Sequence, residues 1–287
     1  MTHTRFMHIL HAVYCEPWLI RPEMHAEICR IVNAHVDGTA HEQGGVALTF
    51  EKPPTTDNDM VRITDDGIGI VSISGVMGQH VDALEKMSGI TDVAEVAEAV
   101  ETLAADGAVR GMVLAFDSPG GTVTGVPELA ATIRQARDVK PVVAFTDSMM
   151  ASAAYWAGSQ AYTIMATESA VLGSIGVYLP VLDSSRQAEM MGLKQEVIQA
   201  GRFKGAGVPG TSLTSEQREE LQGKVNYLHD QFRAGVRSGR GIAIADEHME
   251  GQDFFGKQAV AIGMADQIGN MRDAVALASR ANTEASA

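Results

Sequence analysis

The stretch that decides the fold is Gly111-Met-Val-Leu-Ala-Phe-Asp-Ser-Pro-Gly-Gly121. Its first part, Gly111 to Phe116, is a short apolar run of the kind that forms a strand buried on both faces of a parallel sheet. A turn follows, in which two consecutive glycines let the backbone adopt conformations closed to other residues and present N–H groups to a ligand. Open α/β sheets place their binding sites just beyond the carboxyl ends of such strands. The stretch therefore predicts a buried strand that ends at a functional turn.

Strands and helices alternate on both sides of this stretch. Thr91 is the expected N-cap of the helix that runs to Ala105, with apolar residues along one face. The predicted order is strand 67–76, helix 91–105, strand 111–116, helix 126–137, strand 141–145 and a helix after Ser152. Alternation of this kind predicts an α/β fold with parallel strands covered by helices.

The two ends of the chain differ from this central pattern. Pro22 to Val36 has helical spacing, and residues 37–58 are polar with several glycines and prolines, as in a linker. We therefore expect an N-terminal helical extension and linker over residues 1–60. The main domain would cover residues 61–280, and a flexible tail residues 281–287.

A further helix is expected after Thr214-Ser-Glu-Gln217, which has the pattern of a capping box. An apolar stripe follows at spacings of four, three and four residues, formed by Leu221, Val225, Leu228 and Phe232. The stripe indicates packing, either against the core of the same chain or against a neighbouring subunit.

The composition excludes several classes of partner. The chain has 287 residues and 45% hydrophobic content, which is enough for a buried core. Its 22 Lys and Arg against 36 Asp and Glu give a net charge of −14. Because phosphate binding needs clustered basic residues, we expect no nucleic-acid partner and no attachment to anionic lipid.

The sequence offers no evident metal site or membrane segment. Cys15 and Cys29 form neither a metal-binding pair nor a disulfide framework, and no third ligand accompanies His8 and His11. We expect no metal and no cofactor. No stretch reaches the roughly 18 apolar residues of a membrane span, so we expect a cytoplasmic protein without a signal peptide or membrane anchor.

Ser152 is the candidate nucleophile. It follows the strand 141–145 and a short connection, and a run of helix-forming residues begins after it. A helix N-terminus favours developing negative charge through its dipole and free N–H groups. The neighbours Ala151, Ala153 and Ala154 are small, so a substrate backbone can approach closely. The alternative is that Ser152 only caps the helix.

The glycine turn is the candidate oxyanion hole. Hydrolysis of an acyl bond needs N–H donors aimed at the developing oxyanion. We expect these to be the N–H groups of Gly121 and Ala153, with Gly120 shaping the turn. A substrate would bind in an extended form beside this segment and add a strand to the sheet edge, which makes Thr122 and Val123 candidate substrate-binding residues.

Lys204 is the candidate general base. A serine hydroxyl is a poor nucleophile until a neighbour takes its proton. Beyond Ser152 the only histidines are His229 and His248, in polar, helix-like surroundings, whereas Lys204 lies in a glycine-rich segment after a predicted apolar strand, Glu196–Ile198. The lysine pKa would have to fall from about 10.4 towards about 7–8. That shift costs roughly 4 kcal/mol and requires burial away from carboxylates.

Taken together, these segments resemble the signal peptide peptidase A family of Ser-Lys serine proteases, including its phage branch of head-maturation, or capsid assembly, proteases. The resemblance extends from about Gly67 to Ala276. It is carried by ordered motifs, namely Asp117-Ser-Pro-Gly-Gly121, Ala151-Ser-Ala-Ala-Tyr155, Gly173-Ser-Ile-Gly-Val177, Gly201-Arg-Phe-Lys204 and Gly256-Lys-Gln-Ala259 with Gly263-Met-Ala-Asp266.

The resemblance implies both a fold and a set of roles. The fold would be Clp protease/crotonase-like, and residues 61–280 would form the Ser-Lys protease domain. Ser152 would be the nucleophile and Lys204 the general base, and Ser174 would orient the lysine through a hydrogen bond. Members of the family also assemble into homo-oligomeric rings, in which the serine and the lysine can come from adjacent subunits.

One departure from the bacterial members favours the phage branch. Ser152 is followed by Ala-Ala-Tyr, where bacterial members commonly have Gly-Gly-Tyr, and no membrane anchor is expected. The expected function is a serine endopeptidase that forms an acyl-enzyme and cleaves scaffold or capsid proteins, in the host cytoplasm or the prohead.

Three alternatives remain open from the sequence. The first is a bacterial cytoplasmic protease of the same family that degrades signal peptides or other peptides. The second is a crotonase-type acyl-CoA enzyme, which would need a pair of glutamates and would be indifferent to Lys204→Ala. The third is a catalytically inactive capsid assembly protein, which would form oligomers without hydrolysing peptides.

Overall fold

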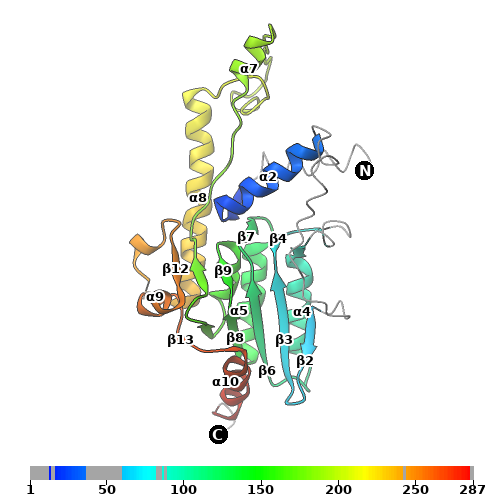
Figure 1. The fold of residues 1–287 in the computed structure, drawn as a ribbon, viewed down its shortest axis with the longest axis vertical. Coiled ribbons are helices and arrows are strands. Elements are labelled where there is room, and N and C mark those ends of the chain that lie inside the picture. Colours follow the sequence, from blue (N-terminus) through cyan, green and yellow to red (C-terminus); the bar gives the residue numbers. More distant parts are fainter. Residues whose placement is uncertain are drawn as a thin grey trace. The chain divides into compact units, whose positions relative to one another are not determined.

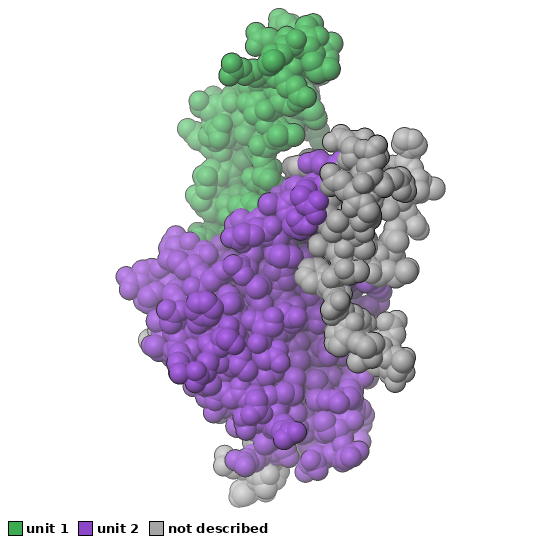
Figure 2. All heavy atoms as spheres, viewed as in Figure 1, with its two compact units in different colours: residues 1–18, 177–230 green, residues 19–176, 231–287 purple. Residues whose placement is uncertain are grey.

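The computed structural model describes residues 13, 17–36, 60–81, 86, 89–241 and 244–284. The predicted linker over residues 37–58 and the side chains of His8, His11 and Cys15 lie outside these ranges. The chain divides into two compact units, shown in different colours in Figure 2. The smaller unit consists of Met1–Trp18 and Val177–Asp230, and the larger unit of Leu19–Gly176 and Gln231–Ala287. The domain bounds expected from the sequence stay a prediction.

A six-stranded sheet forms the centre of the larger unit, in the order β13-β10-β8-β6-β3-β2 (Figure 1). The strands are β2 Val61–Ile63, β3 Ile68–Ser74, β6 Gly111–Asp117, β8 Val142–Thr146, β10 Thr163–Ala166 and β13 Gln267–Ile268. All neighbouring pairs are parallel except β2 with β3. The apolar runs predicted as strands therefore form a mostly parallel α/β sheet, as expected from the alternation.

Helices cover both faces of this sheet. They are α4 Val93–Ala105 and α5 Val126–Val139, which pack on each other, and α10 Met271–Glu284. Ile68 and Ile70 of β3 pack in one cluster with Ala274 of α10. Gly69 lies between them in the strand and faces the other way, so that a Cβ added there would be 2.8 Å from Leu103 Cδ1 of α4. Successive strand residues point to opposite faces, so α4 and α10 lie on opposite sides of the sheet.

The cap predicted for α4 is wrong by one residue. Asp92 is the N-cap, and its Oδ1 accepts a hydrogen bond from the Ala94 N–H at 2.9 Å. The hydroxyl of Thr91 donates instead to the Ser74 carbonyl. An aspartate next to a threonine offers a second capping side chain, and tertiary contacts of the threonine decide between them.

Two smaller sheets adjoin the central one. The first has the order β1-β7-β4-β5 and contains β1 Trp18–Ile20, β7 Gly120–Thr122, β4 Val76–Gly78 and β5 Ile90–Asp92. The second has the order β12-β11-β9 and contains β12 Asp253–Phe255, β11 Val171–Gly173 and β9 Met149–Ala151. Strand β1 was not predicted from the sequence. Strands β7 and β9 carry the candidate site.

The remaining helices are α2 Pro22–Val36, α6 Ala153–Gly158, α7 Ser185–Met190, α8 Ser215–Arg240, α9 Gly256–Ala261 and the 3₁₀ turn η2 Asp246–His248. The predicted helix over 22–36 is confirmed as α2. The predicted capping box of α8 is confirmed as well. Thr214 Oγ1 accepts from the Gln217 N–H at 3.1 Å, and Gln217 Oε1 accepts from the Thr214 N–H at 3.0 Å.

The apolar stripe of α8 is buried to different degrees along the helix. Leu221, Val225 and Leu228 are only partly buried. In the larger unit Phe232 is fully buried and stacks on Trp156 of α6, with ring centroids 4.9 Å apart. Packing in the core of the same chain thus accounts for this end of the stripe.

Within the described ranges, no helix is long and apolar enough to cross a membrane.

Candidate active site

Ser152 lies between β9 and α6 with an uncommon backbone conformation. Its φ is 54° and its ψ is −117°, and a positive φ is rare for a residue with a side chain. Two backbone hydrogen bonds hold this conformation, because the Ser152 N–H donates to the Gly173 carbonyl at 2.8 Å and the Ser152 carbonyl accepts from the Trp156 N–H at 2.9 Å. A serine on a sharp turn from strand to helix is the arrangement that projects a nucleophilic hydroxyl.

The Ser152 hydroxyl does not serve as a helix cap. Ser152 occupies the N-cap position of α6, but its side chain makes no capping hydrogen bond. The alternative that this serine only caps the helix is therefore wrong. The N–H of Ala153 is the first of the helix, and the first N–H groups of a helix have no acceptor within it. Such a group can donate to an oxyanion next to the serine.

The glycine turn lies directly against Ser152. At Gly120, where φ is +103°, an added Cβ would be 2.9 Å from Ser152 Cβ and 3.0 Å from the Ala153 nitrogen. An added Cβ on Gly121 would be 1.8 Å from the Met77 carbonyl oxygen. Neither position has room for a side chain. The structure thus brings together three of the predicted site residues, Gly120, Ser152 and Ala153.

Ser118 is a residue of this site that the sequence reasoning missed. Its side chain is fully buried, donates to the Gly75 carbonyl at 2.6 Å and accepts from the Gly120 N–H at 3.2 Å. The Gly120 N–H is therefore engaged, which leaves Gly121 and Ala153 as candidate oxyanion donors. A serine that accepts the N–H two residues further on is a known turn pattern, so Ser-Pro-Gly was a usable signal.

Backbone hydrogen bonds join the glycine turn to the strand that precedes Ser152. The Ser118 N–H donates to the Met149 carbonyl at 2.9 Å, and the Ala151 N–H donates to the Ser118 carbonyl at 3.1 Å. The backbone of Ser118 is therefore hydrogen-bonded on both sides to the strand that leads into Ser152.

Ser174 is one peptide unit away from the backbone contact of Ser152. It follows Gly173, whose carbonyl accepts the Ser152 N–H, and its own N–H donates to the Gln252 carbonyl at 2.7 Å. Ser174 also has a positive φ, 53°, and is buried.

Of the predicted substrate-binding residues, Thr122 ends β7 and Val123 follows it.

Tyr155 anchors α6 to a distant part of the larger unit. Its hydroxyl donates to the Met264 carbonyl at 2.9 Å, and complete burial raises the pKa of the Tyr155 hydroxyl above its ordinary value. Close by, Arg240 forms an ion pair with Asp266 at 2.7 Å, and Asp266 also accepts from the Ile164 N–H at 2.6 Å. These contacts account structurally for two of the motifs, the one around Tyr155 and the one ending at Asp266.

Lys204 belongs to the smaller unit and is exposed. Its N–H donates to the Gly201 carbonyl at 2.9 Å. The strand predicted over Glu196–Ile198 is wrong, because this segment has no regular structure and the side chain of Ile198 is fully exposed. A short apolar run forms a strand only where another strand pairs with it. The burial that a lysine base requires is thus not present around Lys204 in the described chain.

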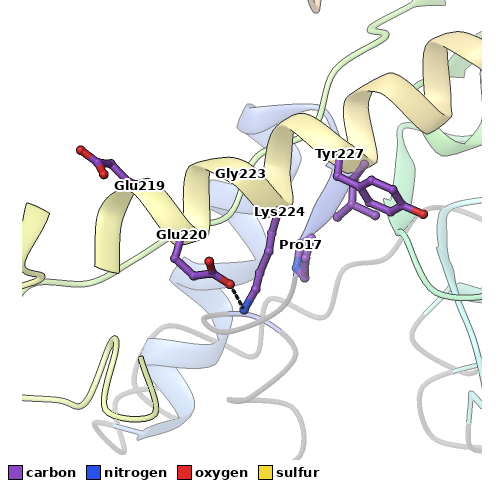
Figure 3. Close-up of a pocket in the computed structure, with 7 residues that line it drawn as sticks. Pro17, Glu219, Glu220, Gly223, Lys224 and Tyr227 are labelled. Atoms are coloured by element: carbon purple, nitrogen blue, oxygen red, sulfur yellow. Dashed lines mark ion pairs between the residues drawn. The ribbon is translucent and has the colours of Figure 1, made fainter. Parts of the chain in front are cut away.

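A groove of about 420 Å³ lies on α8 in the smaller unit (Figure 3). One wall carries an ion pair between Lys224 and Glu220 at 3.7 Å. Its lining consists of Pro17, Glu219, Glu220, Gly223, Lys224, Tyr227 and Leu228. None of the predicted site residues is among them. In the described ranges, no three His, Cys, Asp or Glu side chains gather as they would to hold a metal ion.

Comparison with known proteins identifies relatives among peptidases. The model of peptidase family S49 matches residues 134–284. The chain is 30% identical to the capsid assembly protease C of Escherichia phage lambda over 73% of this chain and 48% of that protein. It is 25% identical to the head-tail preconnector protein GP5 of Enterobacteria phage P21 over 94% of this chain and 56% of that protein.

A bacterial protein is also similar. Protease 4 of Salmonella typhi is 26% identical over 75% of this chain and 34% of that protein. The chain spans about half the length of the phage relatives it matches. The family match covers Ser152, Ser174 and Lys204 and more than half of the chain. The chain therefore belongs to peptidase family S49, a family of serine proteases.

Proposed function

We propose that this chain is a serine endopeptidase with Ser152 as the nucleophile and Lys204 as the general base. The observation that carries the proposal is the strained Ser152 turn packed against Gly120, in a chain of peptidase family S49. The neutral amine of Lys204 takes the proton from Ser152 Oγ while the oxygen attacks the scissile carbonyl. The N–H groups of Gly121 and Ala153 stabilise the oxyanion.

The rest of the cycle follows from the same groups. Lys204 returns the proton to the leaving amine, which departs from the acyl-enzyme on Ser152. A water molecule then attacks the ester carbonyl, and its proton passes through Lys204 back to Ser152 Oγ. Ser174 would hold the lysine amine in position by a hydrogen bond. The fold that we propose for this machinery is Clp protease/crotonase-like, which the mostly parallel sheet with helices on both faces supports.

We propose further that the active form is a homo-oligomeric ring. Lys204 must lose its charge near neutral pH, which needs burial. Because Lys204 is exposed in the described chain, a neighbouring subunit is a source of that burial. The exposed side chains of Leu182, Met190, Leu193 and Ile198 in the smaller unit also favour an apolar interface there.

The biological role that we propose is the cleavage of scaffold or capsid proteins during phage head maturation, in the host cytoplasm or the prohead. Similarity to the capsid assembly protease of phage lambda supports it. Similarity to Protease 4 of Salmonella typhi keeps a bacterial peptide-degrading protease as the second candidate. The family match favours either over a crotonase-type acyl-CoA enzyme. If the chain hydrolyses no peptide, the alternative of an inactive assembly protein would be favoured.

The test is cleavage of denatured casein near pH 8, followed by gel electrophoresis. Cleavage should require both Ser152 and Lys204, so that Ser152→Ala and Lys204→Ala are each inactive. Lys194→Ala is the matched control, because Lys194 is an exposed lysine of the same unit, 2.8 Å from Glu196. Mixing the two inactive variants should restore activity if adjacent subunits share the site. Cleavage by Ser152→Ala would contradict the proposal.

A further inference from the structure

The strand position at which a substrate is expected to add is already filled by the chain itself. In the small sheet β1-β7-β4-β5, strand β7 has a neighbour on each side. On one side Gly121 of β7 pairs with Met77 of β4. On the other side lies β1, the Trp18–Ile20 segment near the start of the chain. An extended peptide cannot pair with β7 as an added strand unless β1 leaves.

The Leu19 carbonyl lies next to the catalytic turn. A Cβ added to Gly120 would be 2.1 Å from the Leu19 oxygen and 2.9 Å from Ser152 Cβ. The Leu19 oxygen and Ser152 Cβ are therefore at most about 5 Å apart. A peptide carbonyl of the chain thus lies beside the side chain of the proposed nucleophile.

The residue after β1 holds the segment in place. The Arg21 N–H donates to the Pro119 carbonyl at 3.2 Å. Its guanidinium forms an ion pair with Asp253 at 3.0 Å, and a second contact at 3.9 Å reaches the sulfur of Met149. Asp253 pairs with Gly173 between β12 and β11, and Gly173 accepts the N–H of Ser152. The Arg21 side chain therefore contacts β9, which leads into Ser152, and β12, which pairs with β11.

The side chains of β1 add apolar burial to these polar contacts. Leu19 is fully buried and Ile20 is 3% exposed. The carboxyl group of Asp253 is partly buried as well, and this burial raises its pKa, an effect that the neighbouring Arg21 opposes. The ion pair with Arg21 thus stabilises a carboxylate that would otherwise be poorly solvated.

We propose that the Trp18–Ile20 segment is an intramolecular occupant of the strand position beside β7 at which a substrate would pair, and that a peptide substrate must displace it before Ser152 can act on that substrate. The inference rests on the proposed function of the same site. A tethered segment has an effective concentration in the millimolar range for short linkers, so it competes strongly with a free peptide. Access to the site would then depend on release of β1 as well as on the affinity of the substrate.

The test measures peptide binding without hydrolysis. A fluorescent peptide with the sequence of residues 16–21, Glu-Pro-Trp-Leu-Ile-Arg, is titrated with the full chain carrying Ser152→Ala, and its anisotropy gives the Kd. Adding Arg21→Ala weakens the occupant but leaves the arginine in the peptide. Because a partly exposed ion pair contributes up to about 1 kcal/mol, the Kd should fall by up to about five-fold.

Two further variants keep the result interpretable. Asp253→Asn removes the partner of both the tethered and the free arginine, so the Kd should change much less than with Arg21→Ala. Arg30→Ala removes an exposed arginine that pairs with Glu27 on α2, and should leave the Kd unchanged. Thermal unfolding by circular dichroism establishes that each variant is folded.

If Arg21→Ala is folded and its Kd for the peptide is unchanged or higher, the proposal is overturned, because β1 would then be a permanent strand of the sheet. The binding experiment uses the inactive Ser152→Ala chain, so a failure of casein cleavage by the unmutated chain does not affect it. Conversely, if the chain cleaves casein but its Kd for the peptide does not respond to Arg21→Ala, the proposal about β1 is wrong and the proposed protease function stands.

Discussion

Removal of the Ser118 hydroxyl should disable the site without touching a catalytic group. Ser118→Ala leaves the buried Gly75 carbonyl and the Gly120 N–H without their partner. An orphaned buried polar group costs about 1–3 kcal/mol, so the two together should lower the free energy of unfolding by roughly 2–6 kcal/mol. The glycine turn would also shift relative to Ser152, and a misplaced oxyanion donor should lower kcat by about ten- to a hundredfold.

The assay combines urea unfolding with peptide hydrolysis well below the unfolding transition. Ser159→Ala is the matched control. Ser159 is equally buried, donates to the Trp156 carbonyl at 2.7 Å and accepts from Gln160 Nε2 at 2.8 Å, but it lies at the far end of α6 from Ser152. This control should lose less stability, because Gln160 Nε2 also donates to the Trp156 carbonyl at 3.3 Å and to the Gly235 carbonyl at 2.9 Å, and it should keep most of its kcat. KM should change little in either variant.

A Ser118→Ala protein that is destabilised as expected but retains its kcat would contradict this prediction. Ser118 would then be a structural residue, and the geometry of the glycine turn would not limit the reaction. Equal losses of kcat in Ser118→Ala and Ser159→Ala would also refute it, because general loosening of the larger unit would explain both.

Two further predictions concern Gly120 and Tyr155. Gly120→Ala places a Cβ at φ +103°, 2.9 Å from Ser152 Cβ and 3.0 Å from the Ala153 nitrogen, so kcat/KM should fall by more than about a hundredfold. Gly107→Ala, whose Cβ meets no atom within 4 Å, should have little effect, and equal kinetics of the two variants would contradict the close approach. Tyr155→Phe removes the hydrogen bond to Met264 and should cost about 1–2 kcal/mol in urea unfolding, while the exposed Tyr162→Phe should cost almost nothing. Burial raises the pKa of the Tyr155 hydroxyl, so the folded chain retains a proton that the unfolded chain loses near pH 10. The contribution of this hydroxyl to the free energy of unfolding is therefore complete below about pH 10 and is lost as the pH rises further. The free energy of unfolding of Tyr155→Phe should fall less steeply with alkaline pH than that of the unmutated chain.

The central strands were predictable because their apolar runs are long enough to require burial on both faces. Local signals also identified the α8 capping box and the turn after β6. The N-cap of α4 was misplaced because Asp92 and Thr91 are both capable caps, and only the contact of Thr91 with Ser74 decides between them. The apolar run over Glu196–Ile198 failed as a strand because no partner strand pairs with it in the described chain.

The sequence predicted that Gly120, Ser152 and Ala153 lie together, which the structure confirms, but it missed Ser118, and the catalytic roles of these residues stay predictions. The identity of Ser152 and the glycine turn could be read from their positions after strands. The positive φ of Ser152 could not, because backbone contacts with Gly173 and Trp156 hold it. Strand β1 is three residues long and forms by pairing with β7 and, at Trp18, with Tyr178, which no local pattern reveals. Lys204 is exposed in the described chain, and the burial that its proposed role needs would come from the proposed assembly.

The central claim is that Ser152 is a nucleophile activated by Lys204. The most direct measurement is labelling of the purified full chain with a fluorophosphonate, followed by mass spectrometry to locate the adduct. We expect a single phosphonylated residue, Ser152, with labelling at least about tenfold slower in Lys204→Ala and unchanged in Lys194→Ala. An adduct on another residue, or labelling of Ser152 at the same rate without Lys204, would contradict it.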